Sequence, residues 1–392
     1  MKSNTLPVCK IKNWDLNNKI VFLRADLNVP LKNGTILDDF RLRAILPTLD
    51  LLLSKNAHII LATHLGRPQG FDATLSTKPL AAWFNAQGYP TEFVASMPDS
   101  SENIKPAHIT LLENLRFNRE EKKQDAQFAQ MLANGADYYV NDAWAVMHRT
   151  DTSITVMPQL FRADKKSIGL LVEKELAALS KIKDAPKHPF VAIIGGGKVA
   201  DKLPVIEALI TTVDILVLEP AIVFTFLKAL GKPVGKSLVD DNLLGYAQKI
   251  LDLAQEHKVT CIFPLDYVVA QDSFYGTLSY CNAENFPETG VGISMGPKTI
   301  TLLEKTVSHA KTIFVNGLMG DITRPETLIE TKKLFELIAH APAYTVIGGG
   351  DSVAAIDMFD LKNNINYCST GGGATLAYIS NAPMPGLDSI LQ

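Results

Sequence analysis

Hydrophobic residues in this chain are concentrated in short runs that recur along its length. Eight runs are rich in β-branched residues and end at turn residues: KIVFLRADLN, AHIILATHLG, ADYYVNDAW, FVAIIGGGK, VDILVLEP, VTCIFPLD, KTIFVNG and AYTVIGGGD. Such runs are typical of parallel strands that helices bury on both faces. Helical patterns alternate with the runs, so the chain is predicted to form α/β, doubly wound parallel sheets of the Rossmann-like type.

The same pattern places a domain boundary near residue 167. Residues 167–183 carry apolar side chains near helical spacing, and the following DAPKHP contains prolines, which end helices. A length of 392 residues suits two domains. We therefore expect an N-terminal domain of residues 1–167 and a C-terminal domain of residues 168–374 that begins with a connecting helix at 167–183.

Composition narrows the class of protein. The chain is 47% hydrophobic and 20% charged, as ordinary globular domains are. Its four cysteines share no zinc-ligand spacing, which suits reduced thiols in the cytoplasm. Residues 1–16 lack the apolar core of a signal peptide, and charged residues and a proline interrupt the longest apolar stretch, 214–230. We expect a cytoplasmic protein without a membrane span.

Charge is unevenly distributed between the two halves. The net charge of the chain is −3, so no general basic excess favours nucleic acid as a partner. Residues 1–167 hold 20 Lys and Arg against 17 Asp and Glu, whereas residues 168–392 hold 18 against 24. This difference suggests that one half binds an anion.

Basic residues in the first half follow the predicted strands. A single arginine is most often a solvated surface residue, but four loops that each offer Arg or His are harder to explain in this way. Guanidinium groups match phosphate and carboxylate in a bidentate manner, and neighbouring Asp and Asn side chains can select hydroxyl groups. The candidate residues for a small anionic substrate are Asp26, Asn28, Arg41, His64, Arg67, Arg116 and Arg149.

Three glycine triplets mark the second half, at 195–197, 348–350 and 371–373. Each precedes a helical pattern, and glycine followed by a helix N-terminus is a common phosphate-binding arrangement. Lys198 and Lys202 follow the first triplet and, four residues apart, are expected to share a helix face. Asp351 follows the second triplet, either as a first-turn acid or as a contact to Mg²⁺. Three triplets in one domain favour a polyphosphate site.

Two motifs offer competing interpretations. GKPVGKS at 231–237 resembles a P-loop, but its first glycine is one residue too close. GGGKVA at 195–200 satisfies the dinucleotide-binding pattern, and Glu219 ends the next predicted strand about 20 residues later, where a ribose-binding acid is expected. This leaves an NAD-dependent dehydrogenase as an alternative.

The chain resembles phosphoglycerate kinases over essentially its whole length. The matching stretches are RADLNVP, DDFRLRAILPT, THLGRP, LLENLRF, NDAWAVMHR, GGGKVADK, GKSL, GPKT, NGLMG, IGGGDS and STGGGA, in the order and spacing of that family. The resemblance implies reversible phosphoryl transfer between 1,3-bisphosphoglycerate and ADP, giving 3-phosphoglycerate and ATP with Mg²⁺. It also implies a monomer with a hinge, two domains that close, and a C-terminal tail at 375–392 that packs on the first domain.

The resemblance assigns roles to individual residues. It gives phosphoglycerate to the seven residues of the first half named above, and catalysis to Arg41, Lys198, Gly372 and Gly373. It gives the nucleotide to Gly196, Gly197, Lys198, Lys202, Asn316, Thr323, Gly348, Gly349, Gly350, Asp351 and Ser352, and the metal to Asp351. The attacking group is already a carboxylate, so catalysis reduces to positioning and charge stabilisation without a general base.

The sequence departs from the family where adenosine is expected to bind. Glu219, Pro220 and Ala221 replace a glycine triplet, Leu318 replaces a proline, and Thr323 stands where an acid is expected to bind the ribose. Asp151 replaces a residue that is often His or Gln. The hypothesis that follows is intact phosphoryl transfer with a remodelled nucleoside pocket, and with either a lower affinity for ATP or a relaxed base selectivity. A non-catalytic binding descendant of the family is the remaining alternative.

Overall fold

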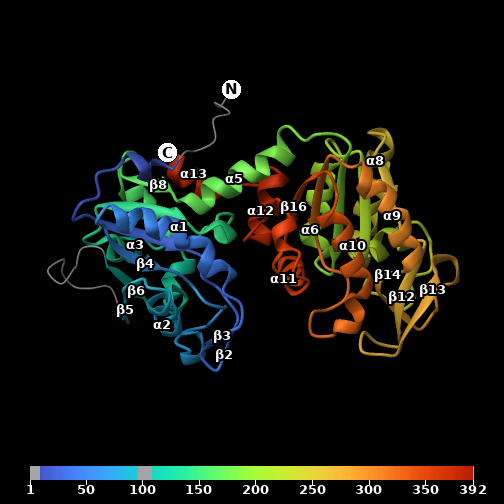
Figure 1. Cartoon of the computed structure of the whole chain (residues 1–392), viewed down its shortest axis with the longest axis horizontal. Coiled ribbons are helices and arrows are strands. Elements are labelled where there is room, and N and C mark those ends of the chain that lie inside the picture. The colour runs from blue at the N-terminus through green and yellow to red at the C-terminus, as the bar shows by residue number, and fades with distance from the viewer. Residues whose placement is uncertain (1–8, 96–107, 392) are drawn as a thin grey trace. The chain divides into compact units, whose positions relative to one another are not determined.

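The computed structural model describes residues 9–95 and 108–391. Residues 1–8, on which the absence of a signal peptide was partly inferred, lie outside this range. The chain forms two compact units, shown in Figure 1. Unit 1 contains the described residues up to Ala177 and those from Pro383 onward, and unit 2 is Ala178–Ala382. The chain therefore divides ten residues after the predicted boundary, within the connecting helix.

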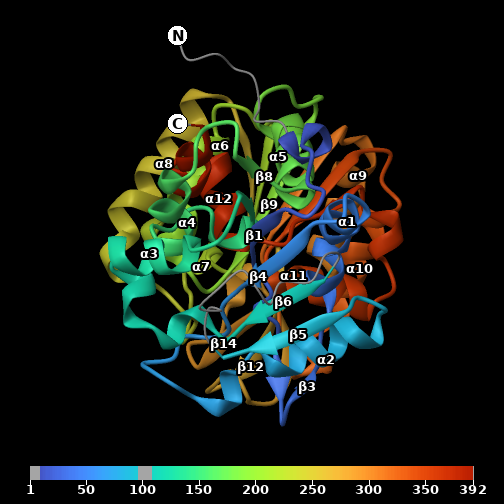
Figure 2. The ribbon, with the colours of Figure 1, turned by 90° about the vertical axis from the view of Figure 1, so that its left-hand side faces the viewer.

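Unit 1 is built on a six-stranded parallel sheet. The strand order is β5-β6-β4-β1-β7-β8, and β1, β4, β6 and β5 can be followed side by side in Figure 2. All six residues of β1 are buried, as expected for a strand covered on both faces. The bounds are β1 Ile20–Ala25, β4 His58–Ala62, β5 Thr91–Val94, β6 Ile109–Leu112, β7 Tyr138–Asp142 and β8 Lys166–Ile168.

Helices and a short hairpin complete unit 1. They are β2 Leu31–Lys32, β3 Thr35–Ile36, α1 Phe40–Ser54, α2 Lys78–Ala86, α3 Ala126–Ala133, α4 Thr152–Thr155 and α13 Pro385–Leu391. Helix α13 comes from the end of the chain and packs on α4 and β8. Ser389 anchors it, because its Oγ donates to the Ile154 carbonyl (3.0 Å) and its own carbonyl accepts from Lys166 Nζ (2.9 Å).

The C-terminal tail therefore differs from the expected one. The structure assigns only Pro383 onward to unit 1 rather than the whole of residues 375–392. Residues Gly372–Ile379 form α12, which packs on helix α6 (Val199–Leu209) of unit 2. Helix α12 buries Leu376 and Ile379 in the core of unit 2, so it belongs to that unit. The sequence pattern alone did not show which core these residues enter.

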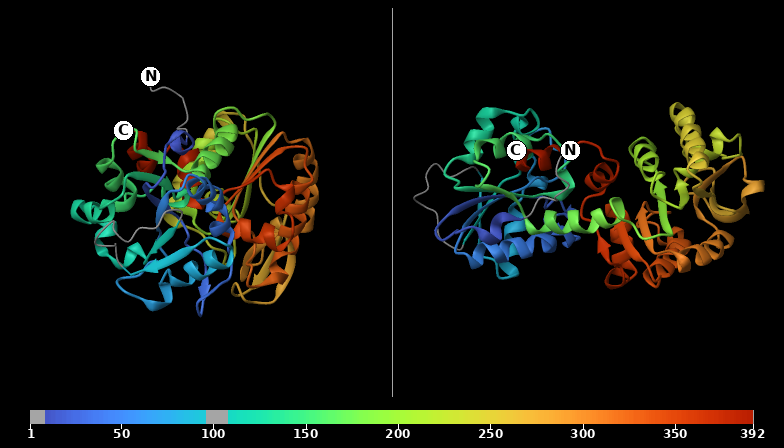
Figure 3. Two further views of the ribbon diagram at one scale, coloured as in Figure 1. Left: turned by 60° about the vertical axis from the view of Figure 1, so that its left-hand side comes forward. Right: turned by 90° about the horizontal axis from the view of Figure 1, so that it is seen from above.

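Unit 2 contains a second six-stranded parallel sheet, in the order β11-β10-β9-β15-β16-β17. The five expected runs of this half all form strands of this sheet. The bounds are β9 Phe190–Gly196, β10 Ile215–Ala221, β11 Thr260–Ile262, β15 Thr312–Asn316, β16 Tyr344–Gly348 and β17 Tyr367–Cys368. Both units are thus doubly wound parallel α/β folds, and the right-hand view of Figure 3 shows helices on both sides of the strands in each.

A three-stranded antiparallel sheet in unit 2 was not predicted. It has the order β13-β12-β14, with bounds β12 Asp266–Gln271, β13 Leu278–Asn282 and β14 Gly290–Met295. Most of edge strand β13 is exposed, so it lacks an apolar pattern. The helices of unit 2 are α6, α7 Val223–Ala229, α8 Leu244–Glu256, α9 Pro297–His309, α10 Ile329–Ala339, α11 Gly350–Met358 and α12. None of the helices in residues 9–95 and 108–391 is long and apolar enough to span a bilayer.

Helix α5 (Leu170–Lys183) forms close to the predicted connecting helix and carries the chain from unit 1 into unit 2. Its first turn is fixed to the end of β7, because Asp142 Oδ1 accepts the Val172 N–H (2.9 Å). Asp142 Oδ2 accepts from Thr48 Oγ1 of α1 (2.5 Å). Burial raises the pKa of Asp142 to about 6, although these hydrogen bonds oppose the shift.

Candidate active site

The carboxyl ends of the unit 1 strands bring the predicted anion-binding residues together. Since the strands are parallel, the loops that follow them gather along one edge of the sheet. Asp26 follows β1, His64 follows β4 and Arg116 follows β6. Arg41 joins them from the first turn of α1.

Asp26 is the centre of this group. Its Oδ2 forms an ion pair with Arg41 Nη1 at 3.0 Å, and Arg41 Nη1 also donates to the Asn28 carbonyl at 2.9 Å. The Asn28 side chain accepts the Gly66 N–H at 2.9 Å, which holds the β4 loop beside the β1 loop. Asp26 is 7% exposed, and its Oδ1 has no hydrogen-bond partner among the described residues. A buried acceptor of this kind is suited to a ligand hydroxyl.

His64 is held as a neutral side chain. Arg24 Nη2 lies 3.3 Å from His64 Nδ1, and arginine can only donate, so Nδ1 is the acceptor and the proton is on Nε2. Burial lowers the pKa of His64 well below its ordinary value, and the four surrounding arginines lower it further: Arg24, Arg116, Arg149 and Arg41. The site thus combines permanent cations with one neutral N–H donor.

A buried hydrogen-bond network holds Arg24, the residue that donates to His64. Arg24 is fully buried and donates from Nε to Ser153 Oγ (2.8 Å), while Ser153 Oγ donates to Glu121 Oε1 (2.5 Å). Glu121 Oε1 also lies 3.8 Å from Arg24 Nη2. Glu121 and Ser153 were not among the predicted residues, although an arginine inside the apolar run of β1 signals a buried partner.

The remaining basic residues differ in their surroundings. Arg116 is buried, donates to the Gly66 carbonyl (2.7 Å) and lies 3.4 Å from Asp151 Oδ2. Arg149 is half-buried and close enough to His64 to affect its pKa. Arg67 is exposed. Asp151, which departs from the family pattern, therefore pairs with a residue of the cluster.

In unit 2 the centre of the predicted site is Lys202. This side chain is 7% exposed, and its Nζ donates to the carbonyls of Gly195 and Asn316, the latter at 2.9 Å. The two carbonyls belong to the ends of β9 and β15, so Lys202 ties the first triplet to a neighbouring strand. Burial lowers the pKa of Lys202 to about 8, and Glu219 opposes this shift.

Lys198 does not share a helix face with Lys202, contrary to expectation. Lys198 is the N-cap of α6, with φ −88° and ψ 69°, and is exposed, whereas Lys202 points into the protein. Helical spacing does not apply across a cap residue, whose dihedral angles lie outside the helix. Lys198 and the exposed Asp351, in the first turn of α11, both influence the pKa of Lys202.

The glycines of unit 2 allow the strand ends to approach one another. A Cβ on Gly317 would lie 2.5 Å from the Gly195 backbone, and Gly317 has φ +147°. A Cβ on Gly372 would lie 3.2 Å from Gly349 Cα, so the second and third triplets are adjacent. Ser352 Oγ donates to the Gly317 carbonyl at 2.7 Å. The structure thus gathers backbone amides and cations, as a polyphosphate cradle requires.

Two residues expected near the nucleoside are engaged elsewhere. Thr323 Oγ1 donates to Asp321 Oδ1 at 2.7 Å and is not connected to the Lys202 group by any described contact. Glu219 is 1% exposed, with its carboxyl group against Gly195. A carboxyl group buried in this way cannot receive the hydroxyls of a bound ribose, which removes the main support for the dehydrogenase alternative.

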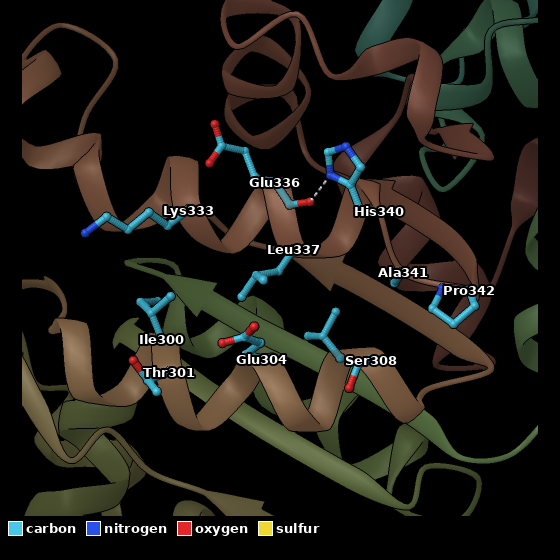
Figure 4. Close-up of a pocket in the computed structure, with 11 residues that line it drawn as sticks. Ile300, Thr301, Glu304, Ser308, Lys333, Glu336, Leu337, His340, Ala341 and Pro342 are labelled. Atoms are coloured by element: carbon cyan, nitrogen blue, oxygen red, sulfur yellow. Dashed lines mark hydrogen bonds between the residues drawn. The ribbon is translucent and has the colours of Figure 1, made fainter.

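A separate groove of about 530 Å³ lies between α9 and α10, as Figure 4 shows. Ile300 and Leu337 contribute apolar surface, and Glu304, Lys333 and His340 contribute polar groups. His340 Nδ1 lies 2.7 Å from the Glu336 carbonyl. None of the predicted site residues lines this groove, so it is distinct from the candidate active site.

An arginine cluster on one sheet and a glycine-rich loop region with lysines on another are the two features expected of a kinase, an enzyme that transfers a phosphoryl group between a nucleotide and a small anion. Residues 11–382 match the family model described as phosphoglycerate kinase. The chain is 38% identical to phosphoglycerate kinase of Dictyoglomus turgidum, covering 98% of both chains. It is 40% identical to that of Pseudothermotoga lettingae, covering 97% of this chain and 98% of the other.

Solved structures are similar over the same length. Phosphoglycerate kinase from Coxiella burnetii aligns with a TM-score of 0.83 at 32% identity, covering 97% of this chain and 98% of the other. The enzyme from Pyrococcus horikoshii aligns with a TM-score of 0.86 at 28% identity, covering 98% of each. The chain belongs to the phosphoglycerate kinase family. Its function is reversible phosphoryl transfer between 1,3-bisphosphoglycerate and ADP, giving 3-phosphoglycerate and ATP, in glycolysis and gluconeogenesis.

Proposed function

We propose that unit 1 binds the phosphoglycerate and unit 2 binds the nucleotide. The observation that carries this assignment is the buried Asp26 Oδ1, which accepts no hydrogen bond from the described residues. Arg41 pairs with the other oxygen of this carboxylate, and His64 Nδ1 lies 3.6 Å from Oδ1. Such a site offers an acceptor for a hydroxyl and donors for a carboxylate or phosphate. The phosphoglycerate residues would be Asp26, Asn28, Arg41, His64, Arg67, Arg116 and Arg149.

In unit 2, backbone amides and lysines would receive the nucleotide phosphates. Those amides belong to the glycine triplets, and Lys202, Asn316 and Ser352 hold the strand ends in place. Lys198 is exposed at the start of α6 and would approach the transferring phosphoryl group. Gly372 and Gly373 are the first two residues of α12, so their backbone N–H groups would face the same group. Lys198 and Arg41 would stabilise the charge that develops during transfer. The two units would close during catalysis to exclude water.

The residues of unit 2 fit a magnesium ion bound with the nucleotide. Mg²⁺ usually takes one or two carboxylates and completes its shell with phosphate and water oxygens. Asp351 is an exposed carboxylate close enough to Lys202 to affect its pKa, so it would face the same phosphates. No group of three or more His, Cys, Asp and Glu side chains in the described part of the chain forms a metal cage. The bound ion would neutralise phosphate charge.

Steady-state kinetics test these assignments. We expect Mg-ATP-dependent phosphorylation of 3-phosphoglycerate, measured through coupled NADH oxidation, and a decrease in kcat of about 10²–10³-fold in Lys198→Ala and in Arg41→Ala. Lys305→Ala removes an exposed lysine of α9 and serves as the matched control, with unchanged kinetics. A Lys198→Ala enzyme that keeps the wild-type kcat would contradict the proposed role.

We also propose that the nucleoside pocket is altered. Supporting this are the Glu219 carboxyl group, which lies buried against Gly195, and Thr323, which bonds Asp321. Loss of an acid for the ribose and of the expected glycine backbone would weaken discrimination between bases. We expect kcat/KM for ATP and GTP to agree within about tenfold, since few base-specific groups remain. A preference for ATP of several hundredfold would refute the altered pocket.

We further propose that the enzyme is a cytoplasmic monomer that does not bind nucleic acid. The four cysteines all lie in the described part of the chain and form no disulfide, which suits a reducing compartment, and the charge of the whole chain is slightly negative. Sedimentation equilibrium tests the oligomeric state. We expect the mass of one chain, 42.8 kDa, and the mass of a dimer would disprove the proposed monomer.

A further inference from the structure

Glu219 is a buried carboxyl group for which the phosphoryl-transfer chemistry has no use. It lies in β10 and is 1% exposed. Its Oε2 would be 2.5 Å from a Cβ placed on Gly195, so the carboxyl group packs directly against the first glycine triplet. Oε2 has no hydrogen-bond partner within the described residues. An acid this deep in the protein is costly unless a nearby charge compensates it.

Lys202 provides that charge without touching it. Its Nζ is committed to the carbonyls of Gly195 and Asn316, and no ion pair joins it to Glu219 in the described part of the chain. Both side chains nonetheless meet at Gly195: Lys202 donates to its carbonyl, and Glu219 occupies the space that a Cβ on this glycine would fill. Glu219 therefore acts on Lys202 through its electric field, which is screened less in the buried interior than in bulk water.

Both groups titrate in the same pH range. Burial raises the pKa of Glu219 to about 8, and Lys202 partly opposes this shift. Burial lowers the pKa of Lys202 to about 8. The other charged groups that face Lys202 are Glu219, Asp351 and Asp201, which raise its pKa, and Lys198, which lowers it. Since each group responds to the charge of the other, the two lose their protons as a coupled pair.

We infer that Glu219 is a positioning residue that, with Lys202, couples the binding of nucleotide phosphates to proton uptake. The inference rests on the proposed role of Lys202 beside those phosphates. An anion favours the charged form of Lys202 and the neutral form of Glu219, and both are the protonated forms. Binding therefore draws protons from the solvent onto the pair, and no bond of the nucleotide changes. Nucleotide affinity falls as the pH rises above about 8, because the unliganded pair then holds fewer protons.

Titration calorimetry with ADP and a fixed excess of Mg²⁺ measures this coupling directly. Binding enthalpies in buffers of different ionisation enthalpy give the number of protons taken up at each pH. For the wild-type enzyme we expect uptake to grow between about pH 7.5 and 9. Glu219→Gln keeps the shape but removes one of the two titrating groups, so uptake at pH 9 falls to about half. A purely structural role would change affinity equally at every pH.

Glu330→Gln is the matched control. Glu330 is also 1% exposed in unit 2 and also has an unpartnered Oε2, but it lies on α10 and pairs with Lys333. We expect this variant to take up as many protons as the wild type.

The possible outcomes distinguish a failure of the proton coupling from a failure of the proposed nucleotide site. Wild-type enzyme that binds ADP without proton uptake above pH 8 overturns the coupling but leaves the nucleotide site intact. Unchanged uptake in folded Glu219→Gln overturns the role of Glu219. Failure of ADP to bind overturns the assignment of Lys202 to the phosphates, and the coupling with it. If Glu219→Gln does not fold, the wild-type measurement still decides whether binding is coupled to proton uptake, and Glu219→Asp, which shortens the acid by one methylene, tests the role of Glu219 through a shifted pH range of uptake.

Discussion

At the level of single residues, the contact between Arg24 and His64 sets the chemistry of the anion site. A histidine among arginines could add a fifth positive charge or remain a neutral donor. The direction of the hydrogen bond from Arg24 to Nδ1, at 3.3 Å, favours the neutral form with its proton on Nε2. Substrate would then meet permanent guanidinium charges, which do not vary with pH, and one uncharged N–H group.

This tautomer can be observed directly. In ¹⁵N-labelled enzyme, long-range ¹H–¹⁵N correlations should show His64 as the neutral Nε2–H form at pH 6, where an unperturbed histidine is roughly three-quarters protonated. Exposed His257 and His309 serve as internal references in the same spectrum. A Nδ1–H tautomer, or a doubly protonated ring at pH 6, would contradict the assignment.

The same lowered pKa affects stability. The unfolded chain binds a proton at His64 below pH 6.5 and the folded chain does not, so this residue reduces the free energy of unfolding as the pH falls. In the wild type, His64 should lower the free energy of unfolding by about 1.4 kcal/mol between pH 7.5 and pH 5.5. The His64→Gln variant should lack this decrease, as measured by urea unfolding at both pH values.

The sequence proposed candidate acceptors and cations for the site but did not show which residues hold them in place. Asp26 stands directly after a predicted strand, where the ends of parallel strands meet. Arg41 and Lys202 lie near the starts of predicted helices. Glu121 comes from a short helical turn, and only the tertiary fold carries it to Arg24. No local pattern could show that pairing. The burial of Glu219 was likewise hidden, because its position in sequence suited a ribose-binding acid equally well.

At the level of elements, α13 completes a unit from which it is far removed in sequence. Ser389 bonds Ile154 and accepts from Lys166, whose side chain is 4% exposed. Burial lowers the pKa of Lys166, so its ammonium group depends on this acceptor. The helix is short and was missed as a separate element, because the tail was taken as one segment from residue 375.

Removing α13 should therefore destabilise unit 1 selectively. Truncation after Ala382 removes the carbonyl that accepts from Lys166 and exposes the surface on which Ile390 packs. Together these losses should lower the free energy of unfolding of unit 1 by about 2–4 kcal/mol. All three tryptophans, Trp14, Trp83 and Trp144, lie in unit 1, so their fluorescence reports on this unit during urea unfolding. Truncation after Ile390, which removes exposed Leu391, is the control. An unchanged tryptophan transition in the longer truncation would show that α13 contributes little.

At the level of the whole molecule, the recurring apolar runs predicted the class of fold, two parallel α/β sheets. The eight runs became eight of the twelve strands, and β5, β6, β8 and β17 were not among them. Strands of buried β-branched residues are conspicuous, and the helix between the units has clear stop signals. The antiparallel sheet β13-β12-β14 was not predicted, because its edge strand is mostly exposed. The boundary was placed ten residues early because a helix that belongs to two cores has no break in its pattern at Ala177.

The division of unit 1 between both ends of the chain affects the order in which it can form during synthesis. The ribosome releases the first 177 residues long before Ser389 and Ile390 exist, and all of unit 2 is made in between. Unit 2 is continuous in sequence and can complete its core while the chain is still growing. The nascent unit 1 is complete only once α13 has been made. Until then, the surface of α4 and β8 that this helix covers stays exposed to solvent.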